Sequence, residues 1–224
     1  MKKRHVQITQ QVMWDESAFF VDCGKIDNDK IIELYYKIQK EDPEGKINSN
    51  DGGYQVMVDK DSSKELYDLF SCLEDAATEI ISRGYKNQTK LKIANAWLNG
   101  NEYGQCNIIH THPGAVLSGV YYVTDTNAEN GEIHLIRPNA DLIEHYKFRS
   151  DEDEDDRCDD EAIAYHMGGL SAFSANASTA ILFAPWIPHY VTTNKTKDIR
   201  IAIGLNFRFE DENDHENEKL EWNL

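Results

Sequence analysis

The sequence predicts a mainly β protein with flanking helices, in which an antiparallel sandwich or small barrel forms the core. Two observations lead to this fold class. Residues 1–90 contain two amphipathic helical patterns, whereas residues 91–209 change to short runs rich in Val, Ile, Tyr and Phe. A chain of 224 residues is long enough for one domain with a proper core. We therefore expect a single domain over 1–224, with N-terminal support over 1–90, the β core over 91–209 and a tail over 210–224.

Two segments of the N-terminal part have the apolar spacing of amphipathic helices. The first runs from Asp29 to Lys40 and the second from Ser62 to Arg83, with apolar side chains three and four residues apart. One of the two serines at its start can cap the second helix, and Gly84 can end it. Neither segment carries His or Cys at the spacing of a metal site, so both are expected to be scaffold.

The following part of the chain has the pattern of seven short strands. Asn-Gly, Pro-Gly and single proline turns separate them, which favours antiparallel connections. The expected strands are Leu91 to Trp97, Gln105 to Thr111, Val116 to Val123, Glu132 to Ile136, Thr179 to Phe183, Tyr190 to Thr193 and Ile199 to Phe209. Residues 138–177 interrupt the pattern and are expected to form an acidic insertion, which at this length is often either disordered or a functional lid.

The net charge of −17 is concentrated in two acidic segments. Residues 151–161 carry a charge of −8 and residues 210–221 a charge of −6, so the rest of the chain is nearly neutral. Such blocks are usually solvated and mobile, and the alternative is a role in binding a cation or a basic partner. In either case nucleic-acid binding is disfavoured, because it needs Lys and Arg to replace the counterions of the phosphates.

The remaining composition favours a soluble, cytoplasmic protein. No apolar run follows the basic N-terminus, so no signal peptide is expected, and no stretch approaches the roughly 18 apolar residues that span a bilayer. The four cysteines are scattered without a C-x-x-C pair, which favours reduced thiols in a cytosolic compartment. They are Cys23, Cys72, Cys106 and Cys158.

Three histidines have the spacing of a mononuclear metal site. Residues i and i+2 of a strand point the same way, so His110 and His112 are expected to present both imidazoles on one face. Pro113 and Gly114 then bend the chain, which places the pair at a strand end. His189 follows a proline-rich turn and lies at the start of another strand. Neutral imidazoles bind first-row divalent metals well, although an H-x-H pair alone also occurs often by chance.

An arginine on the last strand indicates an anion site close to these histidines. The run from Ile199 to Phe207 alternates, with apolar residues on one face and Arg200, Ala202 and Gly204 on the other. The small residues leave space in front of the guanidinium. A buried guanidinium must be paired, and no acid shares its face, so an anion is expected from elsewhere in the chain or as a ligand. Arginine suits a bidentate carboxylate contact.

An ordered set of motifs also runs through the chain. The motifs are Asn48 to Tyr54, Ala96 to Asn99, His110 to Gly114, Leu117 to Val123, Asn130-Gly131, Arg137-Pro138, Phe183 to His189 and Arg200 to Asn206. As a set, they resemble the iron(II)/2-oxoglutarate-dependent oxygenases common in marine bacteria and phages. The resemblance covers about residues 45–137 and 179–207, and the ordered set is far more specific than any single motif.

The resemblance implies a double-stranded β-helix core of the jelly-roll or cupin type, and it implies roles for named residues. The superfamily's metal triad falls on His110, His112 and His189. His112 stands where a carboxylate is usual, so the donor set is either three histidines or includes an acid from elsewhere. Arg200 takes the position that binds the distal carboxylate of 2-oxoglutarate. Tyr122 resembles a tyrosine that helps to hold this carboxylate, and a packed core aromatic is the alternative.

Two further residues leave alternatives open. His134 lies on the expected strand Glu132 to Ile136 and is a substitute ligand if its side chain points inward. Ala202 stands where the superfamily often has serine, so one hydrogen bond to the distal carboxylate is expected to be missing.

The resemblance implies an Fe(II)- and 2-oxoglutarate-dependent dioxygenase that hydroxylates an unidentified substrate and releases succinate and CO2. Its expected partners are 2-oxoglutarate, O2 and that substrate, with ascorbate as an optional cofactor and a homo-oligomer left open. The first alternative is a cupin-type metal-binding protein with another chemistry, which predicts metal without affinity for the cosubstrate. The second is a non-catalytic β-sandwich used for interaction, which predicts no stoichiometric metal.

Overall fold

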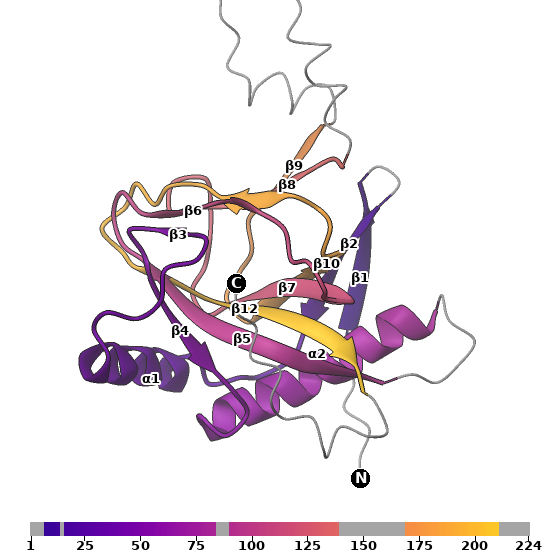
Figure 1. Cartoon of the computed structure of the whole chain (residues 1–224), viewed down its shortest axis with the longest axis horizontal. Coiled ribbons are helices and arrows are strands. Elements are labelled where there is room, and N and C mark those ends of the chain that lie inside the picture. The colour runs from indigo at the N-terminus through magenta and orange to yellow at the C-terminus, as the bar shows by residue number, and fades with distance from the viewer. Residues whose placement is uncertain (1–6, 14–15, 84–89, 139–168, 211–224) are drawn as a thin grey trace, which may run out of the picture.

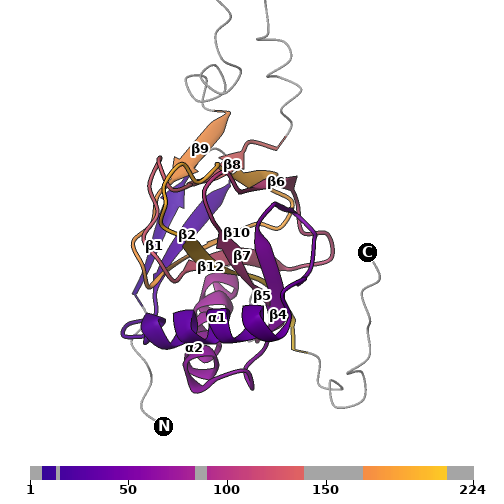
Figure 2. The ribbon, with the colours of Figure 1, turned by 90° about the vertical axis from the view of Figure 1, so that its left-hand side faces the viewer.

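Two antiparallel sheets face each other, and two helices cover the outer face of the larger sheet (Figures 1 and 2). The computed structural model describes residues 7–13, 16–83, 90–138 and 169–210. The helices are α1 (Asn28–Glu41) and α2 (Lys64–Ser82). The strands are β1 (Gln7–Val12), β2 (Ser17–Asp22), β3 (Asn50–Asp51), β4 (Tyr54–Val58), β5 (Leu91–Asn101), β6 (Cys106–His110), β7 (Leu117–Tyr122), β8 (Ile133–Ile136), β9 (Leu170–Phe173), β10 (Thr179–Phe183), β11 (His189–Val191) and β12 (Arg200–Phe209).

The larger sheet has seven strands in the order β1-β2-β10-β7-β12-β5-β4, and the smaller has five in the order β3-β6-β11-β8-β9. Neighbouring strands pair antiparallel throughout both sheets. Consecutive strands of the core alternate between the sheets, as β10, β11 and β12 do. This is the double-stranded β-helix with flanking helices that the sequence predicted. Within the described residues, neither helix has the length and apolar character needed to cross a membrane.

Both helices begin within two residues of the predicted starts, Asp29 and Ser62. Asp27 caps α1 by accepting a hydrogen bond from the backbone N–H of Lys30, and Ser63 caps α2 in the same way from Leu66. Gly84, the predicted end of the second helix, lies outside the described residues. Both helices bury their apolar stripe against the larger sheet, so they are scaffold rather than site.

Strand β12 separates two apolar cores. Ile201, Ile203 and their neighbours of the same parity pack against the helices in the larger core. Ala202 faces the opposite way, into a smaller core between the two sheets. The alternation of β12 therefore has the predicted orientation, and the face with small residues lines the interior of the jelly roll.

The N-terminal part contributes more β structure than the sequence indicated. Strands β1, β2 and β4 extend the larger sheet and β3 joins the smaller one, so residues 1–90 are not only helical. These strands are short, and their polar residues obscured the alternation of apolar and polar side chains that predicts a strand. Strand β9 also lies within the expected insertion of 138–177, whereas the acidic blocks fall almost entirely outside the described residues.

The expectation that the cysteines are reduced is wrong for one pair. Cys23, just after β2, forms a disulfide with Cys72 of α2, although 49 residues separate them. A search for C-x-x-C spacing misses such a bond, because only the packing of α2 on the sheet brings the two residues together. Cys106 is a free thiol. The argument for a cytosolic compartment from cysteine usage therefore does not hold.

Removing this disulfide is expected to destabilise the protein. Cys23→Ala should lower the free energy of unfolding by about 2–5 kcal/mol, because the reduced chain regains the entropy of a long loop when it unfolds. Denaturant unfolding without reductant measures the effect. Cys106→Ala is the matched control and should cost far less. Equal losses for the two variants, or no effect of dithiothreitol on the parent protein, would show that the disulfide does not stabilise the fold.

Candidate metal centre

The three predicted histidines meet between the two sheets. His110 ends β6 and His189 begins β11, and the two residues are directly opposite each other in the smaller sheet. His112 lies two residues beyond His110 and points to the same place. One nitrogen of each ring lies within 4.8 Å of the others. The prediction that His110 and His112 present their imidazoles to one place is confirmed, although β6 ends at His110 and His112 lies beyond the strand.

Backbone carbonyls orient two of the three imidazoles. Nδ1 of His110 lies 2.7 Å from the carbonyl oxygen of Ile108, and Nδ1 of His189 lies 2.9 Å from that of Ile187. Because a carbonyl oxygen only accepts, these contacts place the ring proton on Nδ1. The lone pair of each Nε2 is then free to bind a metal. Nε2 of His112 lies 3.2 Å from Nε2 of His189, so the free nitrogens converge.

The electrostatics of the cluster favour neutral imidazoles. Burial lowers the pKa of all three side chains from their ordinary value, and the neighbouring imidazoles lower two of them further. The pKa of His112 falls to about 3 and that of His189 to about 4. Near neutral pH the three rings are therefore unprotonated, which is the form that binds a metal.

A β-bulge in β6 turns Asn107 toward the cavity, which the sequence did not predict. His110 pairs with His189 and Asn107 pairs with Val191, so β6 has one extra residue between these partners. Asn107 and His110 both line the interior, whereas the intervening Ile108 is 53% exposed. A strict period of two would place Asn107 on the opposite face from His110. Bulges of this kind often re-aim side chains beside a site.

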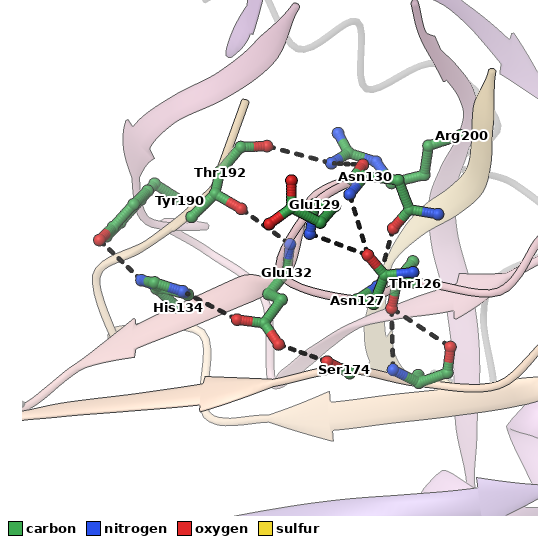
Figure 3. A network of polar contacts seen from close by, with 11 residues as sticks. Thr126, Asn127, Glu129, Asn130, Glu132, His134, Ser174, Tyr190, Thr192 and Arg200 are labelled. Carbon is green, nitrogen blue, oxygen red and sulfur yellow. Dashed lines mark hydrogen bonds and ion pairs between the residues drawn. The ribbon is translucent and has the colours of Figure 1, made fainter. Parts of the chain in front are cut away.

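Arg200 is buried in the same interior. Its side chain is 2% exposed, and among the described residues its guanidinium donates only to neutral oxygens. Nη1 contacts the carbonyl oxygens of Thr192 at 3.2 Å and Asn130 at 3.3 Å (Figure 3). Nη2 contacts Oδ1 of Asn107 at 3.5 Å. No ion pair with an Asp or Glu of the described residues compensates its charge, and burial lowers its pKa to about 10.

Tyr122 lies on β7 beside this arginine. It is directly opposite Ala202 of β12, whose small side chain leaves room in front of both residues. Tyr122 is 1% exposed, and its hydroxyl has no hydrogen-bond partner among the described residues. Burial raises the pKa of Tyr122, while the nearby Arg200 opposes this shift, so the hydroxyl keeps its proton and can donate.

One open cavity joins these groups, with the three histidines, Arg200 and Tyr122 among its lining residues. The donor set of three neutral imidazoles fits a first-row divalent metal such as iron(II). The uncompensated guanidinium and the unpartnered hydroxyl fit a carboxylate. The residues present therefore fit a metal together with an organic acid.

His134 is not part of the cluster. It lies on β8, and its Nδ1 contacts the hydroxyl of Tyr190 at 2.7 Å on the face of the smaller sheet that points away from the cavity. Figure 3 shows it with Glu132, whose Oε2 lies 3.6 Å from Nε2 of His134. The alternative of His134 as a substitute ligand is therefore not supported.

Gly131 makes room for the guanidinium of Arg200. Its φ of +109° lies where L side chains are strained, and an added Cβ would collide with Nη1 of Arg200 and the carbonyl of Thr192. Gly131→Ala is expected to displace the guanidinium and weaken carboxylate binding at least about tenfold. Gly104→Ala is the control, because Gly104 has a similar φ of +82° but open space around it. Calorimetry with 2-oxoglutarate on both variants compares the effects, and equal affinities would contradict the steric role.

A known protein family is similar to the part of the chain that contains these residues. A family model described as "Putative 2OG-Fe(II) oxygenase" matches residues 95–206, which is half of the chain. The match contains the three histidines, Tyr122 and Arg200. No curated protein matches the chain.

Several solved structures share the fold at low identity. EctD from S. alaskensis, in its apoform, has a TM-score of 0.59 at 14% identity, over 93% of this chain and 88% of its own. A prolyl-4-hydroxylase from Pseudomonas putida has a TM-score of 0.55 at 11% identity, over 91% and 93%. HygX from Streptomyces hygroscopicus, with nickel and 2-oxoglutarate bound, has a TM-score of 0.55 at 9% identity, over 85% and 82%.

Proposed function

The chain belongs to the 2OG-Fe(II) oxygenase family, and from this premise we propose which residues perform each step and what the reaction yields. Iron(II) and 2-oxoglutarate are the cofactor and cosubstrate of this family. We assign the iron to His110, His112 and His189, and the distal carboxylate of 2-oxoglutarate to Arg200 and Tyr122. The proposed reaction is hydroxylation of a C–H bond in a second substrate. Bound iron(II) and 2-oxoglutarate supply its oxidising chemistry, in which one atom of O2 enters the substrate and the other enters succinate as CO2 leaves.

The ligand set is proposed to be three histidines, without a carboxylate. Among the described residues, the metal-binding group contains only imidazoles, and neither Asp nor Glu lines the cavity. Such a set leaves the iron with more positive charge than a site with one carboxylate ligand. The carboxylate of the bound cosubstrate can offset part of this charge.

Residues of the chain itself prepare the site for this reaction. The backbone carbonyls that hold His110 and His189 fix the direction of their free nitrogens. Arg200 orients the cosubstrate through two parallel N–H donors, and Tyr122 adds a hydroxyl donor from the adjacent strand. Apolar side chains such as Phe183 and Ile133 line the rest of the cavity and limit the access of water.

One observation carries the proposal: a triad of neutral imidazoles and a buried arginine without an acidic partner share one cavity. A structure of the same fold, HygX, was solved with nickel and 2-oxoglutarate bound, and another is a prolyl-4-hydroxylase. These relatives support the assignment of cosubstrate and reaction. The charge of −17 argues against nucleic acid as substrate, which leaves a small molecule or a protein side chain.

The direct test is turnover of 2-oxoglutarate with iron(II) and ascorbate. We expect stoichiometric metal after anaerobic loading and iron-dependent formation of succinate. Metal binding without affinity for 2-oxoglutarate would favour a cupin-type protein with another chemistry. Neither metal nor 2-oxoglutarate binding would indicate a non-catalytic interaction module.

A further inference from the structure

The imidazole of His112 is held differently from those of the other two candidate ligands. Nδ1 of His110 and Nδ1 of His189 each contact a backbone carbonyl oxygen. Nε2 of His112 contacts Nε2 of His189, but its Nδ1 has no hydrogen-bond partner among the residues that the structure describes. A histidine that binds a metal usually donates its second ring N–H, and this bond sets the direction of the ring. A contact of another kind must therefore direct His112 if the protein prepares this ligand in advance.

The backbone of His112 is fixed, but this does not determine where its ring points. Its N–H donates to the carbonyl oxygen of Pro185 at 2.9 Å, and its carbonyl oxygen accepts a hydrogen bond from the N–H of Ala115 at 3.3 Å. These bonds join the turn after β6 to the turn before β11. However, β6 ends at His110, so no paired strand restricts the side chain of His112. Its side-chain torsions are therefore set by packing.

The indole of Trp97 packs on this ring. The ring centroids of Trp97 and His112 are 5.6 Å apart, and the ring planes are tilted by 34°. The ring of His112 also stacks on that of His189, at 4.9 Å and 28°. It thus contacts one ring from each sheet, since Trp97 lies on β5 and His189 on β11. The face of an indole attracts positive charge, so this contact should strengthen when a bound metal makes the imidazole more positive.

Gly204 determines where the indole lies. Trp97 of β5 is directly paired with Gly204 of β12, and both residues line the cavity. A Cβ on Gly204 would collide with Cε2, Nε1 and Cζ2 of Trp97, so the indole lies in the space that a side chain would occupy. The φ of Gly204 is not in the left-handed region, so the backbone does not require glycine here. The position of the ring does.

We propose that Trp97 is a positioning residue for the metal centre: its indole, packed across Gly204, directs Nε2 of His112 toward the metal. Backbone carbonyls have the same role for His110 and His189. This inference rests on the proposed function for the presence of the metal, which Trp97 itself does not touch. A tryptophan that only filled the cavity wall would affect stability and leave the metal affinity of the folded protein unchanged.

The test compares Co(II) affinity among four variants of the full chain. Trp97→Leu removes the ring and should weaken Co(II) binding by about tenfold or more, the range expected when a residue that orients a ligand is lost. Trp97→Phe keeps a flat ring and should recover most of the affinity. Gly204→Ala keeps Trp97 but displaces its indole, so it should also weaken binding. Trp186→Leu is the control, because Trp186 is 58% exposed and does not line the cavity, and it should bind Co(II) like the parent.

Calorimetric titration of the metal-free proteins measures these affinities, and a melting curve of each variant shows that it is folded at the temperature of the titration. Parent affinity in a folded Trp97→Leu would assign the ring a structural role and overturn the proposal. Equal affinities of Trp97→Phe and Trp97→Leu, or an equal loss in Trp186→Leu, would do the same. Absence of Co(II) binding by the parent would instead contradict the metal centre, so the two failures are distinguishable.

NMR of the metal-free protein tests the ring contact without any metal. Nuclear Overhauser effects should connect the indole protons of Trp97 with the ring protons of His112 in the parent, and Gly204→Ala should weaken them. This measurement does not depend on whether Trp97→Leu folds. Absence of the effects in the parent, or effects of parent intensity in a Gly204→Ala protein with weakened Co(II) binding, would overturn the proposed role of the indole.

Discussion

His189→Ala is expected to abolish stoichiometric iron binding and, with it, iron-dependent consumption of 2-oxoglutarate. The buried Nε2 of His189 converges with that of His112, so removing it takes away one of three ligands and leaves two from a single short segment. Loss of a residue that merely supports a ligand weakens metal binding about 10–100-fold, and loss of the ligand itself should exceed this range. Anaerobic titration with Fe(II), followed by metal analysis, measures the affinity.

His134→Ala is the matched control for this variant. His134 lies on the strand next to His189, but it contacts Tyr190 on the face away from the cavity. It should therefore retain the affinity of the parent protein for iron. Because His189 is buried, His189→Gln is measured as well, and its melting curve shows whether the fold survives. Iron binding by a folded His189→Gln at the parent's affinity would remove His189 from the ligand set.

The sequence was sufficient to predict that the three histidines and Arg200 lie close together. The sequence correctly predicted that His110 and His112 present their imidazoles to one place. However, β6 ends at His110, so the period of a strand does not account for the orientation of His112. The alternation of β12 correctly placed Arg200 and Ala202 on the face away from the apolar core with the helices. The roles of these residues as ligands stay predictions until metal and cosubstrate are measured.

Of the features that the sequence did not predict, one is local and the others depend on contacts between distant segments. The bulge that turns Asn107 inward interrupts the two-residue period of β6, and no residue type in this segment predicts it. The placement of the Trp97 indole across Gly204 follows from the pairing of β5 with β12, which the sequence did not specify. The Cys23–Cys72 bond follows in the same way from the packing of α2.

Arg200→Met is expected to weaken 2-oxoglutarate binding by about 30-fold or more. Removing one partner of a buried, hydrogen-bonded charge pair costs at least about 2 kcal/mol and often more, and every 1.4 kcal/mol is a factor of ten in affinity. The apparent KM for 2-oxoglutarate should rise accordingly, while metal binding by the three histidines remains. Methionine fills the space of the arginine stem. Without its ligand, the guanidinium has no acidic partner among the described residues, so the variant should fold at least as well as the parent.

Two further variants test whether the loss of affinity comes from the two parallel N–H donors of the Arg200 guanidinium. Arg200→Lys keeps the positive charge but loses the two parallel donors, so its affinity for 2-oxoglutarate should lie between those of Arg200→Met and the parent. Arg208→Ala removes an arginine from the same strand that does not line the cavity, and it should bind 2-oxoglutarate normally. If Arg200→Met kept the KM of the parent, the carboxylate would have to bind elsewhere. The buried, uncompensated charge of Arg200 would then have no explanation in this site.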